Sequence, residues 1–234
     1  MDSRDRLGQL EALLRDGSIN QSRMALDELA QMPSEVVVPM LQTLTKAKNF
    51  QIRRLAVIGL GNHRTEASFQ ALKETLDQEK DGNVLAEAAN SLFEFGDTAI
   101  PLLQALFSRC DEWLTRQTIL SILMEAKQPE VLLDVVRAGL RDSTQTVRET
   151  AILAMGPLMN GPVEPEALTL LRELATAPNW RDRWRSATTL SLSSSAEAKR
   201  LLAMLSQDEN HYVVAAALES GFAGGTGGVE ETGK

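Results

Sequence analysis

The chain has 234 residues, a formal net charge of -8 and a single cysteine, Cys110. One cysteine excludes an internal disulfide and a metal site made of several thiolates, and the acidic balance argues against sequence-independent binding of DNA or RNA, which needs a basic face. With 43% hydrophobic and 24% charged residues, the chain can bury a core.

The first residues, 1–6, are polar and charged, and no apolar stretch of the kind found in a secretory signal follows them. No later run approaches the roughly 18 apolar residues that a transmembrane helix needs. We therefore expect a cytoplasmic, reducing location and no membrane insertion.

A first type of apolar segment recurs along the chain. Residues Pro39–Leu44 match Pro101–Leu106, and shorter pieces of the same kind begin at Leu10, Leu171 and Leu202. Within these segments the apolar residues recur at helical spacing, which predicts one helix in each.

A second type of segment follows each of the first. It opens with an apolar anchor and has a small residue, usually alanine, four positions later, which lets two helices approach closely. One early unit is centred on Ala25 and Leu29. The later anchors are spaced 32, 30, 33, 37 and 29 residues apart and are Ile52, Val84, Leu114, Val147, Trp184 and Val213. This regularity predicts about seven units.

Short polar turns rich in Asp, Ser and Asn separate the segments, and these residues are good N-caps. Pro129 and Pro165 stand where first helices begin, and Pro39 and Pro101 fall within or early in first helices. A single hairpin of about 30 residues cannot bury its apolar face alone. The sequence therefore predicts an all-α fold, an α-solenoid of about seven stacked helical hairpins over residues 1–221, followed by a flexible, glycine-rich tail at 222–234.

This pattern resembles HEAT repeats, and more narrowly the short type named after phycobilisome lyases, over residues 7–221. The sixth unit departs from the pattern through a longer link, Ala175–Asp182. The residues that carry the resemblance are Pro39, Pro101, Asp142, Val147, Arg148 and Ala151.

The resemblance implies a HEAT-like superhelix whose concave surface binds another protein or a peptide. One setting that it implies is the assembly, maintenance or turnover of phycobilisomes or photosynthetic complexes. It also implies an enzymatic alternative, a bilin lyase or lyase subunit that attaches a tetrapyrrole to phycobiliproteins or detaches it. Bilin would be a cofactor only under that alternative.

Arginines near the start of second helices form one candidate group. Each would pair with a turn aspartate and join neighbouring units in an Asp–Arg ladder, or would line a groove and hold carboxylates. We favour the structural ladder, which consists of Arg54, Arg116, Asp142 and Arg148.

The segment 180–185 is the most unusual, because it holds two of the three tryptophans and three arginines. Trp and Arg are favoured at protein interfaces, and the guanidinium group can hold carboxylates. Trp184 is expected in the core position of Ile52 and Val147, whereas Trp180 lies in the link. The candidate contacts with a partner or a pigment are Trp180, Arg181, Arg183, Trp184 and Arg185.

The remaining candidates for chemistry are few. Cys110 has no histidine near it in the sequence, and a partly buried structural thiol is expected. His63 and His211 are far apart in the chain, and no phosphate-binding glycine loop or metal-ligand motif is present. The sequence therefore favours a noncatalytic interaction module with no metal and no nucleic-acid partner.

Overall fold

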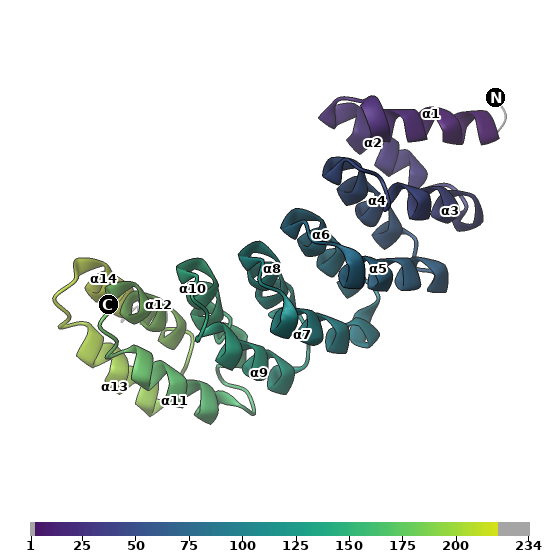
Figure 1. Cartoon of the computed structure of the whole chain (residues 1–234). Helices are drawn as coiled ribbons and strands as arrows, with labels where there is room; N and C mark the ends of the chain where they lie inside the picture. Colours follow the sequence, from purple (N-terminus) through teal and green to yellow (C-terminus); the bar gives the residue numbers. More distant parts are fainter. Residues whose placement is uncertain (1–2, 220–234) are drawn as a thin grey trace, which may run out of the picture. The chain divides into compact units, whose positions relative to one another are not determined.

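The computed structural model describes residues 3–219, and this part of the chain contains fourteen α-helices, two short 3₁₀ helices and no strand. Consecutive helices pair into hairpins, α1 with α2 through to α13 with α14 (Figure 1), which confirms the predicted all-α repeat solenoid. The helices are α1 (Ser3–Asp16), α2 (Ile19–Leu29), α3 (Ser34–Leu44), α4 (Phe50–Asn62), α5 (Glu66–Gln78), α6 (Gly82–Phe93), η1 (Gly96–Ala99), α7 (Ile100–Arg109), α8 (Trp113–Leu123), α9 (Pro129–Gly139), α10 (Gln145–Leu153), η2 (Gly156–Leu158), α11 (Glu164–Leu174), α12 (Trp180–Leu190), α13 (Ala196–Leu205) and α14 (His211–Glu219).

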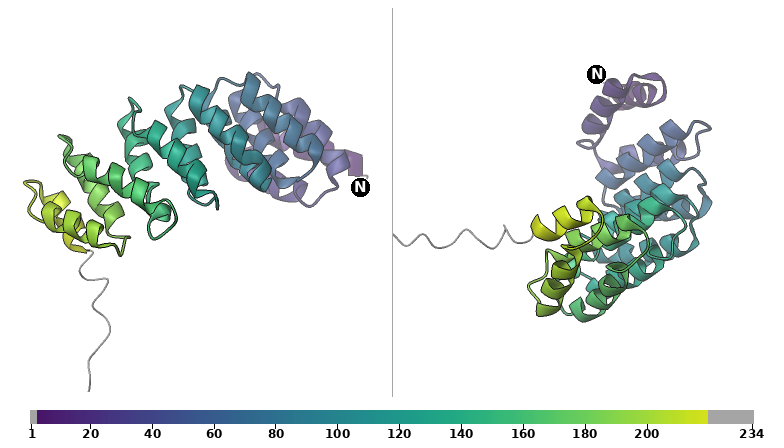
Figure 2. Two further views of the ribbon diagram at one scale, coloured as in Figure 1. Left: turned by 90° about the horizontal axis from the view of Figure 1, so that it is seen from below. Right: turned by 90° about the vertical axis from the view of Figure 1, so that its left-hand side faces the viewer.

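The chain divides into two compact units, Met1–Ile122 and Leu123–Lys234. In the first unit, α2, α4 and α6 pack in succession as one layer, and α3 packs against α5 in the other. In the second unit, α10, α12 and α14 form the corresponding layer, and α11 packs against α13 (Figure 1 and Figure 2). We call the layer of even-numbered helices the second-helix layer. The tail predicted at 222–234 lies outside the described residues.

Short polar side chains fix where the second helices start. The Asn49 side chain accepts a hydrogen bond from the Gln51 backbone N–H, and Asp81 accepts from the N–H groups of Asn83 and Val84. These bonds satisfy donors that have no partner inside the helix, and removing such a cap costs about 1 kcal/mol.

The prolines occupy positions that their missing N–H tolerates. Pro101, Pro129 and Pro165 lie in the first turn of α7, α9 and α11, where the backbone N–H has no intrahelical partner. Pro39 lies inside α3, as expected from the sequence.

The core consists of leucines and small residues. Leu41, Leu60 and Leu92 are fully buried, and burial of one such side chain stabilises the fold by about 1.5–3 kcal/mol. Helices α4 and α6 approach so closely that a Cβ atom on Gly61 would lie 2.9 Å from the Cβ of Ser91. Small residues at these crossings are therefore required by packing.

Two predicted anchors differ from the structure. In α8 Thr115 is fully buried, as are Ile119 and Leu120, and Leu114 is only partly buried. In α12 the N-cap is Asn179, so the position three residues after the cap is Asp182 and not Trp184.

The error at Trp184 has a physical reason. In α4, α6 and α10 the residue three positions after the cap is apolar, namely Ile52, Val84 and Val147. In α12 that position carries a charge, and Trp180 and Trp184, four residues apart, imitate the apolar spacing of a buried face. With the corrected register, α12 starts at Trp180, inside the predicted link Ala175–Asp182.

Candidate functional site

Helix α12 has two chemically different faces. Arg183, Ser186, Ala187 and Leu190 are buried, whereas residues 180, 181, 184 and 185 face outward and are exposed or half-buried. The outward residues are two pairs with i,i+4 spacing, so two tryptophans and two arginines lie side by side on the second-helix layer of the second unit.

Three aromatic rings form one cluster on α12 and α14. Trp180 stacks on Trp184 with a centroid distance of 6.0 Å and on Tyr212 at 5.5 Å, and Trp184 lies 6.2 Å from Tyr212. These distances are typical of favourable aromatic pairs. Trp180 and Trp184 are half-buried, and Tyr212 is 51% exposed. We call Trp180, Trp184 and Tyr212 the aromatic cluster.

Two guanidinium groups cover the cluster. The Cζ of Arg181 lies 4.7 Å from the centroid of the Trp180 ring, and the Cζ of Arg185 lies 3.9 Å from that of Trp184. Both distances fall within the range of cation–π attraction. Glu149 of α10 completes the surface, because its carboxylate accepts a hydrogen bond of 3.1 Å from Arg185 Nε and lies 3.9 Å from Arg181 Nε.

Arg183, predicted as a contact residue, instead lies in the interior. Its Nη1 donates to the carbonyl oxygens of Ala177 at 2.9 Å and Pro178 at 3.1 Å, in the turn before α12. Its Nε and Nη2 donate to the two carboxylate oxygens of Asp208 at 2.7 and 3.0 Å. The Arg183 side chain is 10% exposed, and it joins the turns of two successive hairpins.

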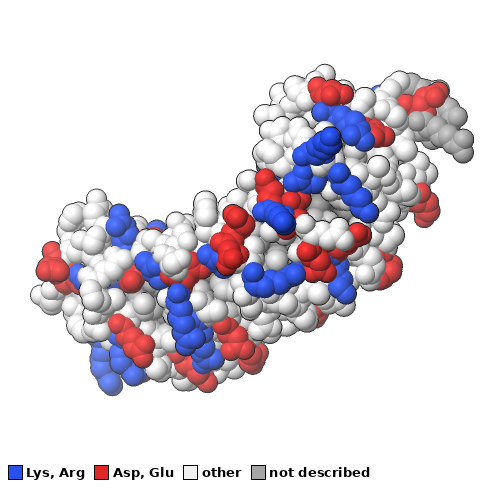
Figure 3. All heavy atoms as spheres, viewed as in Figure 1, with Lys and Arg blue, Asp and Glu red and all other residues white. Residues whose placement is uncertain are grey.

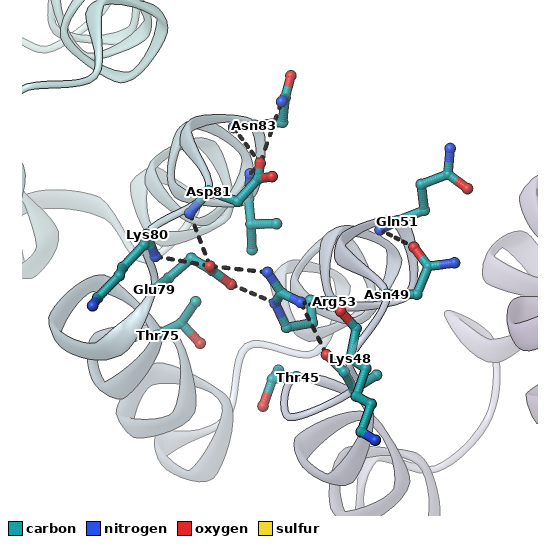
Figure 4. A network of polar contacts seen from close by, with 12 residues as sticks. Thr45, Lys48, Asn49, Gln51, Arg53, Thr75, Glu79, Lys80, Asp81 and Asn83 are labelled. Carbon is teal, nitrogen blue, oxygen red and sulfur yellow. Dashed lines mark hydrogen bonds and ion pairs between the residues drawn. The ribbon is translucent and has the colours of Figure 1, made fainter.

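The same arrangement occurs in the first unit at Arg53 (Figure 4). Its Nη1 donates to the carbonyl oxygens of Ala47 and Lys48, both at 3.0 Å, and its Nε donates to Glu79 at 2.6 Å. We call Arg53 and Arg183 the turn arginines. They occupy the same place, four residues after the caps Asn49 and Asn179.

The turn arginines shift the pKa values of their partners. The hydrogen bond from Arg183 lowers the pKa of Asp208 below its ordinary value, against the opposing effect of burial. At Glu79, burial alone would raise the pKa, but the bonds from Arg53 and from the backbone N–H groups of Lys80 and Asp81 outweigh it and lower the pKa. Both carboxylates are therefore held ionised.

The predicted Asp–Arg ladder differs in its details. Arg54 does not reach a turn aspartate, because it points outward and pairs at 2.9 Å with Glu87 of α6. Arg148 donates to the backbone carbonyl oxygens of Asp142 and Ser143 at 2.8 and 3.1 Å. Arg116 likewise donates to the carbonyl oxygen of Cys110 at 2.7 Å. Arg116 and Arg148 thus bind the backbone of the preceding turn, as Arg53 and Arg183 do, whereas Arg54 does not.

Sequence reasoning missed three members of the surface: Tyr212, His211 and Glu149. Tyr212 is the chain's only tyrosine, and it lies one repeat length after Arg181, since the caps Asn179 and Asn210 are 31 residues apart. Comparing exposed positions between successive units would have placed it beside the cluster. The His211 ring packs on Tyr212 with a centroid distance of 4.1 Å.

The other candidate residues have structural surroundings. Cys110 is partly buried at the end of α7. His63 is buried at the end of α4, with its Nδ1 3.0 Å from the Ser34 hydroxyl, and burial lowers its pKa. Across the described residues, no group of three or more His, Cys, Asp or Glu side chains is placed to hold a metal ion. No helix in this range is long and apolar enough to cross a membrane.

Comparison with known families agrees with this architecture. A model of HEAT repeats matches residues 8–93, 99–191 and 133–222. The chain belongs to the HEAT-repeat family. No curated protein matches this HEAT-repeat chain significantly.

Several solved structures are similar to it. An engineered protein has a TM-score of 0.52 at 16% identity, over 94% of this chain and 67% of that one. A Kap121p mutant has a TM-score of 0.54 at 14% identity, and the match covers 94% of this chain but only 29% of Kap121p. The complex of CpcE and CpcF of phycocyanin lyase from Nostoc sp. has a TM-score of 0.48 at 18% identity, over 94% of this chain and 88% of that one. At these identities the first two likenesses show the fold alone, and the third is too distant to carry an argument about function.

Proposed function

We propose that this HEAT-repeat chain is a noncatalytic scaffold that binds a partner protein through the second-helix layer of its second unit. The aromatic cluster carries the proposal. The chain has only ten Phe, Trp and Tyr residues, and three of them gather on this outward face, where they fill no core position.

The composition of this surface supports binding. Trp, Tyr and Arg are the side chains that most often dominate the energy of protein interfaces. The rings of Trp180 and Tyr212 are held by stacking and do not need to be ordered when a partner arrives, which reduces the entropy cost of association. The planar guanidinium groups of Arg181 and Arg185 present several N–H donors to a carboxylate, which suits them to recognition.

Quantitative affinity purification from native cells tests this function. The full chain is compared with the variant Trp180→Ala/Tyr212→Ala and with the matched control Phe50→Ala/Trp113→Ala. Phe50 and Trp113 are, like Trp180, the first residues of second helices and are 39% and 46% exposed, but they lie in the first unit. We expect a partner that is captured by the wild type and the control and lost with the cluster variant. Capture that is unchanged by the cluster variant, or absent with all three proteins, contradicts the proposal.

The phycobilisome setting and the bilin-lyase alternative are tested with the same preparations. Enrichment of a phycobiliprotein among the captured proteins would support the setting. Mixing the purified chain with bilin at tens of micromolar and recording the visible spectrum tests the alternative. The scaffold proposal predicts no absorbance shift, and a shift that disappears in the cluster variant would favour the lyase.

A further inference from the structure

The two outward arginines of α12 are oriented by the rings beneath them. Arg181 and Arg185 stack on Trp180 and Trp184, with Cζ atoms 4.7 and 3.9 Å from the ring centroids. The N–H groups of a guanidinium lie in its plane. A guanidinium that lies over a ring can therefore still donate from its edge to a carboxylate, in the two-pronged geometry that Arg favours. The aromatic cluster thus holds two guanidinium groups, with their donors, at the outward face of α12.

These donors exceed the acceptors that the protein supplies. Each guanidinium has five N–H groups, yet Arg181 and Arg185 share the single carboxylate of Glu149. That carboxylate accepts a hydrogen bond of 3.1 Å from Arg185, lies 3.9 Å from Arg181 and also accepts a hydrogen bond of 3.0 Å from Gln145. The Arg181 side chain remains 51% exposed.

The neighbouring carboxylates are engaged with other groups. Asp182 accepts a hydrogen bond from Gln145 at 3.2 Å, and Asp208 is bound by the turn arginine Arg183. Glu209 also lies 3.3 Å from Arg183, although its side chain is 89% exposed. The outward surface is therefore locally rich in unfilled donors on a chain of net charge -8.

From this geometry we infer that the partner contributes an acidic segment, with at least two carboxylates for Arg181 and Arg185 beside a large apolar side chain that packs on Tyr212. The inference rests on the proposed function and names the chemistry of its partner. Binding through such exposed charges weakens as ionic strength rises.

Two other ligands fit the surface less well. An aromatic cage for a methylated ammonium group needs rings that surround a space, whereas these rings pack on each other at interplanar angles of 21–47° and arginines cover two of them. Nucleic acid needs a broad basic field, but basic and acidic side chains alternate over the face shown in Figure 3.

Selection of random twelve-residue peptides on the full-length protein tests the inference. We expect the selected peptides to be rich in Asp and Glu next to Leu, Phe or Trp. The affinity of the best peptide, measured by fluorescence anisotropy, should fall at least about tenfold in Arg181→Gln/Arg185→Gln, because losing one charged hydrogen-bonded contact already has that scale and this variant removes two. It should rise about threefold in Glu149→Gln, because that change removes the carboxylate that competes for both guanidinium groups. Circular dichroism melting verifies that the variants are folded.

A fall in affinity in Arg181→Gln/Arg185→Gln together with a rise in Glu149→Gln distinguishes an acidic ligand from any other. Peptides without acidic enrichment, failure to select any peptide, or an affinity that falls in Glu149→Gln would overturn the inference. The scaffold function would survive these results if the natural partner is still captured by the wild type and lost with the cluster variant. It fails separately if that capture does not depend on the cluster.

Discussion

Helices α4 and α12 occupy the same place in their hairpins but differ in what they present. On the inner side they are alike, because Arg53 and Arg183 both bind the preceding turn and a carboxylate of the next hairpin. On the outer side, the residue that follows the turn arginine is Arg54 in α4 and Trp184 in α12. Packing between successive hairpins thus fixes the residues on the inner side of each second helix, whereas the residues on its outer side are free to acquire a function.

The outer side of the first unit is covered by one-to-one ion pairs. Arg54 pairs with Glu87 at 2.9 Å. Arg64 pairs with Glu94 at 2.5 Å, and both residues of this second pair line a polar groove of about 340 Å³ between α4 and α6. In the second unit, two arginines share Glu149 over aromatic rings. In the first unit each of these two arginines has a carboxylate of its own, whereas in the second unit two arginines share one.

The largest expected effect comes from the buried alanines that both units share. Ala56 and Ala151 lie seven residues after the caps of α4 and α10 and are fully buried. Ala56→Asp or Ala151→Asp would bury a charge without a partner and should each lower the free energy of unfolding by about 3–5 kcal/mol. Urea unfolding measures both. A loss below about 1 kcal/mol for either one would show that the inner side of that helix is wrongly assigned.

The turn arginines should give the next largest effect. Arg53→Met and Arg183→Met remove the hydrogen-bonding partner of Glu79 and Asp208, whose side chains are each 9% exposed. We expect losses of about 2–3 kcal/mol, because a largely buried carboxylate loses a charged donor. Arg54→Met is the matched control. A loss of unfolding free energy in only one of the two variants would contradict the equivalent roles of Arg53 and Arg183.

Acid should destabilise the protein over two pH ranges. The folded-state pKa of His63 lies below 6.5, so its contribution to stability is complete above pH 6.5 and is lost as the pH falls below that value. The lowered pKa values of Glu79 and Asp208 give stability that is present above 4.5 and 3.8 and lost as the pH falls through their folded-state values.

Urea midpoints between pH 7 and 3 measure this dependence. His63→Gln should flatten the slope just below pH 6.5 and leave the loss below pH 4.5 in place. An unchanged slope in that variant would contradict the assignment of the first loss to His63.

The smallest effects on stability are expected on the outer sides. Arg54→Ala and Arg181→Ala remove half-exposed groups from ion pairs, and each should change the free energy of unfolding by at most about 0.5 kcal/mol. Thermal melting checks this expectation. A larger change at Arg181 would mean that the cluster stabilises the fold and is not available for binding.

The sequence predicts the hairpins because apolar spacing, caps and small residues agree with one another in most units. It also points to residues 180–185, because tryptophan is rare in this chain. It does not separate Arg53 from Arg54, or Arg183 from Arg185, since one residue along a helix rotates a side chain by about 100°. The partnership of Tyr212 with Trp180 depends on packing between hairpins that only the structure shows.

The central claim is that the aromatic cluster, and not the equivalent surface of the first unit, binds the partner. The most direct measurement is a titration of the captured partner against the wild type, Trp180→Ala/Tyr212→Ala and Phe50→Ala/Trp113→Ala. The account predicts binding at least about tenfold weaker in the first variant, the effect expected for an interface anchor, and an unchanged affinity in the second. Equal losses in both variants, or a loss only in the second, would contradict it.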